Sequence, residues 1–147
     1  MSKRTVLLVE DNPDDAFFVE RAFRKAGMVE VLRTVSHGEE AVEYLTGMGR
    51  FRDASLYPVP SLMLLDLRLP RMSGFEVLEW LRSQPRLNRL PVVILSSSSQ
   101  STDIDRAYEL GANSYLVKPV SFENLVDMVR ALGLYWFVWS QTPHLNI

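Results

Sequence analysis

The 147-residue chain contains no cysteine, which excludes disulfide bonds and thiolate metal sites and fits a reducing compartment. It also lacks long hydrophobic runs. The first apolar stretch is Thr5–Val9, and the longest one near the C-terminus is Leu134–Trp139. Both are too short for a signal peptide or a membrane span. These absences predict a soluble, cytoplasmic protein with no membrane partner.

The chain also lacks a large excess of charge of either sign. The 16 basic and 18 acidic residues give a net charge of −2, and the isoelectric point is about 5.7. Nonspecific affinity for nucleic acid comes from Lys and Arg that neutralise phosphates, and no basic stripe is present. We therefore expect no nucleic-acid partner. The length and the 47% share of apolar residues predict one domain over residues 1–147.

Short β-branched or leucine-rich runs alternate with segments of helical period, which is typical of βαβ units around a parallel sheet. The expected strands are Thr5–Val9, Val29–Val35, Ser61–Leu65, Val92–Ser96 and Ser114–Val117. The expected helices are Asp14–Ala26, Glu39–Leu45, Phe75–Ser83, Thr102–Leu110 and Phe122–Leu134. The pattern predicts an α/β fold of the (βα)5 type.

One segment, from Gly47 to Pro60, has no period and contains two glycines and two prolines. We expect an extended surface loop there, longer than most connections in such a fold. Two interpretations stay open at this point. The loop binds a partner, or it is an insertion of the kind that surface loops tolerate.

Asp66 is the most informative residue, because it follows the apolar run Leu62–Leu65. A carboxylate at the end of a buried strand is costly to charge unless a partner stabilises it. In parallel α/β sheets, ligands bind beyond the carboxyl ends of the strands. The polar residues at those ends are Glu10 and Asp11 after the first expected strand, Asp66 after the third, Ser96 and Ser97 at the end of the fourth, and Lys118 after the fifth.

Three carboxylates, a hydroxyl and an ammonium at one edge indicate a Mg²⁺ and phosphoryl site, because Mg²⁺ prefers carboxylate, water and phosphate oxygens. Without a cation, at least one of the carboxylates should hold its proton more tightly. Lys118, Ser96 and the backbone N–H of Ser97 can bind phosphoryl oxygens. Asp66 would then be a nucleophile that forms an aspartyl phosphate.

Several short motifs follow one another in a specific order and spacing. They are Val9-Glu10-Asp11-Asn12, Asp66-Leu67-Arg68-Leu69-Pro70 followed by Gly74, Pro91 to Ser96, Gly111-Ala112, and Tyr115 to Pro119. With these motifs the chain resembles the receiver domain of two-component response regulators over residues 5–132, which leaves an aromatic extension over 133–147. The resemblance implies a flavodoxin-like, doubly wound sheet of five parallel strands in the order 2-1-3-4-5.

The resemblance also implies roles for the residues at the strand ends. Asp66 accepts a phosphoryl group from the phosphohistidine of a sensor histidine kinase, so the protein is not an enzyme that turns over an external substrate. The implied ligands of Mg²⁺, or of Mn²⁺, are Asp11, Asp66 and the backbone carbonyl of Arg68, with Glu10 acting through a water. The implied phosphoryl-binding groups are Ser96, Ser97 and Lys118.

In that family a hydroxyl moves toward the phosphoryl group while an aromatic ring on the fifth strand rotates inward. Here those positions are Ser96 and Tyr115. The surface that changes is formed by the fourth helix, the fifth strand and the fifth helix. The resemblance further implies a cis Lys118–Pro119 peptide bond. Arg68 stands two residues after the acceptor, and we hypothesise that its long side chain partly covers Asp66 and slows attack by water.

After the last expected helix only residues 135–147 remain, so we expect a stand-alone regulator with no output domain. The segment Tyr135–Trp139 is unusually aromatic for a tail. This tail and the loop from Gly47 to Pro60 resemble the stand-alone regulators paired with bacterial phytochrome kinases, a subgroup whose fourth-helix and fifth-helix surface forms homodimers. The tail either caps its own core or forms part of a dimer contact.

Other functional classes share this architecture. Phosphatases with an aspartate nucleophile resemble Asp-x-Asp, but Arg68 stands at the position of their second aspartate. A nucleotide or flavin binder needs a glycine-rich phosphate loop, whereas the residues from Glu10 to Pro13 would repel phosphate. The remaining alternative is a receiver-fold module that binds partners without phosphorylation, and the intact set of strand-end residues disfavours it.

Overall fold

Five parallel strands form a single sheet in the order β2-β1-β3-β4-β5. The computed structural model describes residues 4–28, 31–139, 141, 143 and 145. The strands are β1 (Val6–Val9), β2 (Leu32–Val35), β3 (Leu62–Leu65), β4 (Val92–Ser96) and β5 (Ser114–Val117). The α-helices are α1 (Pro13–Lys25), α2 (Gly38–Thr46), α3 (Gly74–Ser83), α4 (Ser101–Glu109) and α5 (Phe122–Gly133). The predicted fold and strand order are confirmed, while Val29 and Glu30 of the second expected strand lie outside the described residues.

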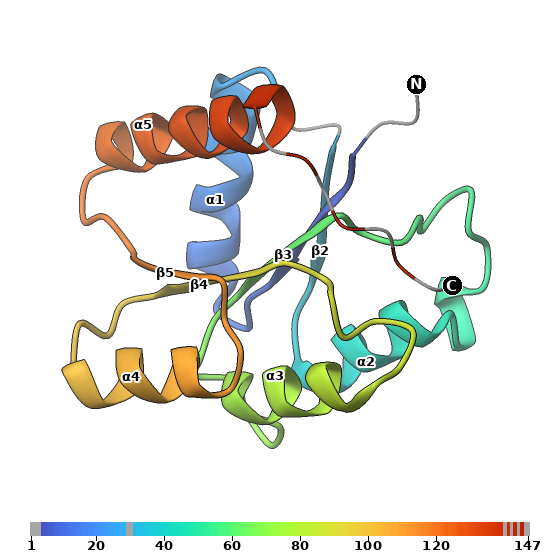
Figure 1. The fold of residues 1–147 in the computed structure, drawn as a ribbon. Coiled ribbons are helices and arrows are strands. Elements are labelled where there is room, and N and C mark those ends of the chain that lie inside the picture. The colour runs from blue at the N-terminus through green and yellow to red at the C-terminus, as the bar shows by residue number, and fades with distance from the viewer. Residues whose placement is uncertain (1–3, 29–30, 140, 142, 144, 146–147) are drawn as a thin grey trace.

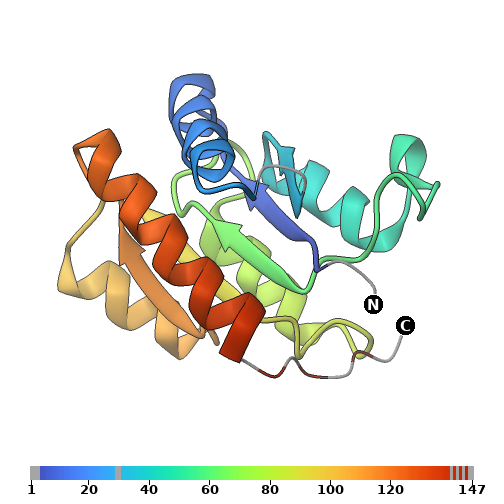
Figure 2. The same cartoon turned by 90° about the horizontal axis from the view of Figure 1, so that it is seen from above.

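The helices cover both faces of the sheet. Helices α1 and α5 lie on one face, and α2, α3 and α4 lie on the other (Figures 1 and 2). Successive side chains of a strand point to opposite faces, so Leu8 and Leu64 pack beneath α1 and α5, whereas Leu7 and Leu65 pack against α2 and α3. Strands β1 and β3 are buried on both faces, which explains why their sequences are continuous apolar runs.

The dipeptide Asn12-Pro13, which follows Glu10 and Asp11, fixes the start of α1. The Asn12 side chain accepts hydrogen bonds from the backbone N–H groups of Asp14 and Asp15, at 2.9 and 3.2 Å. Pro13 occupies the first helical position, where a missing N–H costs nothing. This cap brings the first turn of α1 to the carboxyl edge of the sheet.

The start of α3 lies directly against the backbone of Asp66. Ser73 and Glu76 form a capping box at this helix end. A Cβ atom on Gly74 would lie 2.2 Å from the carbonyl oxygen of Asp66. Only glycine therefore allows the helix to approach this closely, and the contact fixes the loop that follows Asp66.

The segment from Gly47 to Pro60 is a packed structure rather than a simple extended loop. It contains a short 3₁₀ helix, η2 (Gly49–Phe51), and Phe51 is buried. The ring centroids of Tyr44, Phe51 and Tyr57 lie 5.1 to 5.9 Å apart. The Tyr44 hydroxyl donates to the carbonyl of Pro58 at 2.8 Å. A cavity of about 550 Å³ separates this aromatic cluster from the end of α3.

The aromatic extension continues α5 as a π-helical turn, η3 (Leu134–Trp139). Trp136 is buried in the core under α1 and α5, and its carbonyl accepts a hydrogen bond from Arg4. Leu134 and Tyr135 are exposed. Trp136 therefore caps the chain's own core, one of the two outcomes expected for the tail. None of the described helices has the length and apolar character needed to cross a membrane.

Candidate functional site

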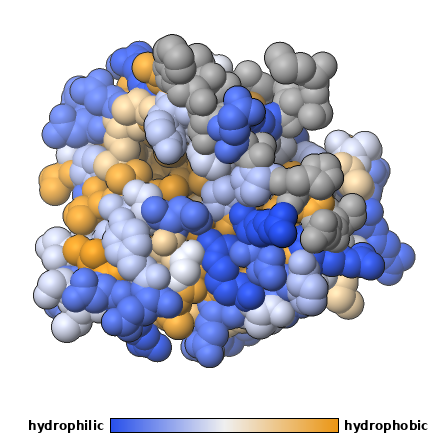
Figure 3. Space-filling model, in the orientation of Figure 1, coloured by the Kyte–Doolittle hydropathy of each residue, from blue (hydrophilic) through white to orange (hydrophobic). Residues whose placement is uncertain are grey.

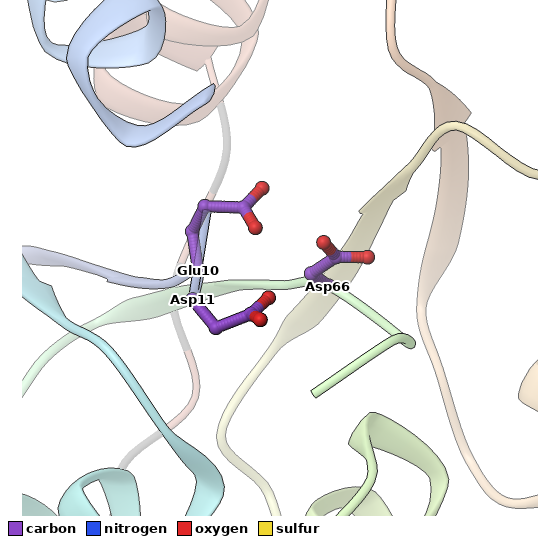
Figure 4. A group of neighbouring side chains, drawn as sticks. All are labelled: Glu10, Asp11 and Asp66. Carbon is purple, nitrogen blue, oxygen red and sulfur yellow. The ribbon is translucent and has the colours of Figure 1, made fainter. Parts of the chain in front are cut away.

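The register of β1 against β3 places two carboxylates side by side. Val9 is paired with Leu65, so the next residues, Glu10 and Asp66, leave the sheet at the same level. The Asp66 N–H donates to the carbonyl of Val9 at 3.1 Å and extends the ladder by one bond. Carboxylate oxygens of Glu10, Asp11 and Asp66 lie within 4.8 Å of one another. The three side chains converge on one space (Figure 4).

The Lys118 ammonium lies against this acidic cluster. Its Nζ atom is 3.2 Å from Asp66 Oδ2 and 3.1 Å from Asp15 Oδ2, and it also pairs with Glu10 Oε1. Glu10 and Asp66 are buried, whereas Asp11 is exposed at the mouth of the site. The structure thus brings together the three predicted carboxylates and the predicted lysine.

Ser96 is fully buried at the end of β4, the strand that pairs with β3. Ser96 is paired with Val117 of β5. The backbone N–H of Lys118, the residue after Val117, donates to the Ser96 carbonyl at 2.8 Å. The same ladder therefore positions both predicted phosphoryl-binding side chains. The Ser96 hydroxyl accepts the backbone N–H of Ser98 at 3.2 Å. Ser97 is exposed at the start of the following loop.

Burial and the neighbouring charges shift the pKa values of Glu10 and Lys118. Burial, and then the hydrogen bond with Asp66, raise the pKa of Glu10 from its usual 4.5 to about 7. Burial alone would lower the pKa of Lys118, but the hydrogen bond with Glu10 and the charge of Asp66 raise it above its usual value. Glu10 is thus a carboxylate that holds its proton more tightly, as the sequence predicted.

Tyr115 is connected to Ser96 through the loop between β4 and α4. Its hydroxyl donates to the carbonyl of Ser98 at 2.8 Å, and the ring is half-buried. The N–H of Ser98 in turn binds the Ser96 hydroxyl. Ser98 therefore links the two side chains. A movement of the Ser96 hydroxyl toward Asp66 would break its hydrogen bond with the Ser98 N–H, and the carbonyl of Ser98 is the group that binds Tyr115.

Two details differ from expectation, one from our hypothesis about Arg68 and one from the resemblance. The Arg68 side chain is 67% exposed and its Nη2 atom lies 3.7 Å from Asp103, so in this state the guanidinium is drawn to Asp103. No peptide bond among the described residues is cis, and Lys118–Pro119 is trans. Trans is the isomer of lower energy before proline, and the Lys118 side chain reaches the carboxylates with it.

Sequence reasoning missed Asp15 as a member of the site. It lies in the first turn of α1, where an acidic residue is also favoured by the helix dipole. That general preference hid the specific contact with Lys118. The available signal was the Asn12-Pro13 start, because a helix that begins directly after the acidic pair must bring its first turn to the same edge.

The comparison with known families agrees with this geometry. Residues 6–130 match the response regulator receiver domain, and the chain belongs to that family. It is accordingly of the phosphoacceptor class rather than a conventional enzyme. The acidic cluster of Glu10, Asp11 and Asp66 is typical of the metal site of receivers.

Individual relatives align over most of their length. The probable methanogenesis regulatory protein FilR2 of Methanothrix harundinacea is 39% identical over 138 residues, which cover 94% of this chain and 86% of that protein. Response regulator Rcp1 of Synechocystis is 34% identical over 140 residues, 95% of this chain and 93% of that one.

Solved structures of such regulators superpose closely. The Mn²⁺-bound form of Rcp1 gives a TM-score of 0.83 at 32% identity, covering 97% of this chain and 100% of that chain. The phosphorylated cyanobacterial phytochrome response regulator RcpA gives 0.87 at 34% identity, again covering 97% and 100%.

Proposed function

We propose that this protein is a stand-alone response regulator that accepts a phosphoryl group on Asp66 from the phosphohistidine of a sensor histidine kinase. One observation carries the proposal. A partly buried ammonium, that of Lys118, lies 3.2 Å from Asp66 Oδ2 beside a cluster of carboxylates at the carboxyl edge of the sheet. This set can attract a phosphoryl group, neutralise its oxygens and offer a carboxylate as nucleophile.

The transfer requires one bond to form and one to break. A carboxylate oxygen of Asp66 attacks phosphorus, and the P–N bond of the phosphohistidine breaks. The imidazole nitrogen recovers the electron pair and takes up a proton. Lys118 and the Ser97 backbone N–H bind phosphoryl oxygens, and burial around Ser96 limits the access of competing water.

A divalent cation fits the same residues. Oxygens of three acidic side chains lie within 4.8 Å of one another, and burial, followed by the hydrogen bond with Asp66, raises the pKa of Glu10, so a bound cation would stabilise the charged form of the group. We assign Mg²⁺, or Mn²⁺, to Asp11, Asp66 and the Arg68 carbonyl, with Glu10 acting through water, and the Mn²⁺-bound relative supports this choice. When bound, the ion neutralises the charge that gathers on the transferring oxygens.

The signal would leave through Ser96 and Tyr115. The phosphorylated state favours movement of the Ser96 hydroxyl toward Asp66, which releases the N–H of Ser98 and loosens the hydrogen bond partner of Tyr115. Phosphorylation thereby biases two arrangements of the surface formed by α4, β5 and α5.

That α4-β5-α5 surface suits a homodimer. Apolar side chains gather where these elements lie in Figure 3, on the left of the view, and Tyr108, Val117 and Val120 are exposed there. We propose that the protein dimerises through this surface, and the phytochrome regulators among its relatives make a phytochrome the proposed kinase class. Residues 5–132 form the receiver core, and residues 133–147 form the extension.

Incubation with acetyl phosphate and Mg²⁺ tests the proposal. Wild-type protein should gain the mass of one phosphoryl group by intact mass spectrometry, and Asp66→Ala should gain none. The same samples on a size-exclusion column should show a dimer shift only for phosphorylated wild type. Glu43→Ala, an exposed carboxylate on α2 and so outside the α4-β5-α5 surface, is the matched control and should behave as wild type.

The alternative of a partner-binding module that works without phosphorylation gives the opposite result. In that case wild type gains no mass, and its oligomeric state is the same with and without acetyl phosphate. A mass gain that survives in Asp66→Ala would show that another side chain is modified and would contradict the assignment of Asp66.

A further inference from the structure

Asp103, in the first turn of α4, joins the two loops that leave the site. Its Oδ2 atom accepts the Ser98 hydroxyl at 2.6 Å and lies 3.7 Å from Nη2 of Arg68. The first contact is partly buried and short, as expected for a hydrogen bond to a carboxylate. The second involves an exposed guanidinium. One oxygen therefore holds Ser98 firmly and Arg68 loosely.

Both partners of Asp103 stand two residues after a site residue and bind it through their backbone. The Arg68 N–H donates to Asp66 Oδ1 at 3.3 Å. The Ser98 N–H donates to the Ser96 hydroxyl at 3.2 Å. Asp103 is therefore coupled to the acceptor on one side and to the phosphoryl-binding hydroxyl on the other, without touching the acidic cluster itself.

We propose that Asp103 is a positioning residue that shortens the lifetime of the aspartyl phosphate by drawing the Arg68 guanidinium away from the phosphoryl group. The inference rests on the proposed phosphorylation of Asp66. A phosphoryl group there adds an anion next to the Arg68 backbone, and a guanidinium binds phosphoryl oxygens in a bidentate manner. Asp103 competes for the same guanidinium, and an exposed ion pair is weak enough to exchange.

The competition matters because the loss of the phosphoryl group needs water. A water oxygen attacks phosphorus, the bond between phosphorus and the Asp66 oxygen breaks, and the carboxylate and orthophosphate are the products, with the water protons passing to phosphate and solvent. A guanidinium bound to the outer phosphoryl oxygens covers part of the approach to phosphorus. Arg68 held by Asp103 leaves that approach open.

The variant Asp103→Asn separates the two contacts of this residue. An amide oxygen still accepts the hydrogen bond from Ser98, but the negative charge that attracts Arg68 is gone. Protein phosphorylated with acetyl phosphate is desalted into Mg²⁺ buffer, and its decay is followed by intact mass. We expect the lifetime to rise about two- to fivefold, the range that corresponds to the strength of an exposed ion pair.

The second variant is Arg68→Ala, alone and combined with Asp103→Asn. Arg68→Ala should be slightly shorter-lived than wild type, and in its background Asp103→Asn should have no further effect. Asp103→Glu, which restores the charge, should return the lifetime toward that of wild type. Asp105→Asn removes the same charge two residues along α4 and should leave the lifetime unchanged.

A merely structural role for Asp103 predicts something else. In that case Asp103→Asn alters the lifetime of the aspartyl phosphate equally with and without Arg68, and this result would overturn the inference. An unchanged or shortened lifetime in Asp103→Asn, at a melting temperature that matches wild type, would also overturn it. Failure of the proposed function looks different, because wild type would then gain no phosphoryl group at all.

Discussion

The carboxyl edge of the sheet and the aromatic cluster of Tyr44, Phe51 and Tyr57 are held together by opposite means. At the edge, oxygens of three carboxylates lie within 4.8 Å of one another, and the Lys118 ammonium pairs with two of them, Glu10 and Asp66. In the cluster, aromatic rings meet at centroid distances of 5.1 to 5.9 Å with their one buried hydroxyl satisfied. The aromatic cluster satisfies its own polar group, whereas the edge of the sheet gathers more acidic than basic groups, which fits the cation and the phosphoryl group proposed above.

Burial has the same chemical effect in both regions but different consequences. It raises the pKa of Glu10 to about 7 and the pKa of Tyr44 to about 12. At neutral pH Tyr44 simply remains uncharged. The pKa of Glu10 instead lies near neutral pH, where the proposed cation would favour its charged form. The candidate site therefore lies in the region where burial brings carboxylates together, and not in the aromatic cluster.

The largest expected effect is on stability in the aromatic cluster. Phe51→Ala should lower the free energy of unfolding by about 4 kcal/mol, because it removes a buried ring and leaves a cavity. Urea unfolding measures this, and Phe17→Ala, an exposed ring on α1, should stay within about 0.5 kcal/mol of wild type. Labelling by acetyl phosphate, tested where both variants are folded, should not change. Reduced labelling would show that the two regions are coupled.

Lys118→Met should produce the next largest effect, at the edge of the sheet. Without the ammonium, Glu10 and Asp66 face each other uncompensated, and we expect a loss of about 3 kcal/mol of unfolding free energy in metal-free buffer. Mg²⁺ should recover more stability in this variant than in wild type. Lys25→Met, an exposed lysine on α1, is the control. Equal responses to Mg²⁺ in all three proteins would contradict the metal assignment.

The smallest expected effect is a loss of stability at high pH that depends on Tyr44. Its pKa is raised on folding, so the folded state holds the phenolic proton more tightly. The contribution is therefore fully present below pH 10 and is lost as the pH rises toward 12. Between pH 9 and 11, wild type should lose about 1 kcal/mol relative to Tyr44→Phe, measured by urea unfolding. Parallel stability curves for the two proteins would contradict it.

The fold was predictable from sequence because its signals are local. Continuous apolar runs marked β1, β3 and β4, and the helices begin within one residue of their expected starts. The packing of the segment from Gly47 to Pro60 was not predictable. Its aromatic residues follow no period, and only the tertiary contact of Phe51 with Tyr44 and Tyr57 turns them into a cluster.

The site was predictable as far as strand ends determine it. Glu10, Asp66 and Lys118 each follow directly on a strand, so the parallel register brings them to one edge. Asp15 and Asp103 lie in first turns of helices, and their contacts depend on how those helices dock. The direction of the Arg68 side chain was not predictable either. It depends on which carboxylate lies nearest in the folded chain, here that of Asp103.

The contacts of Lys118 have one more consequence. An ammonium has three N–H bonds, and this one already faces three carboxylates, those of Glu10, Asp15 and Asp66. On the proposed function, a phosphoryl oxygen would bind this ammonium in exchange for one of the three carboxylates. The Asp15 side chain is 41% exposed and that of Glu10 only 1%, so water can replace the ammonium at Asp15 and not at Glu10. The proposed phosphorylation of Asp66 would then exchange one hydrogen-bond partner of the Lys118 ammonium, and the first turn of α1 would lose its contact with this lysine.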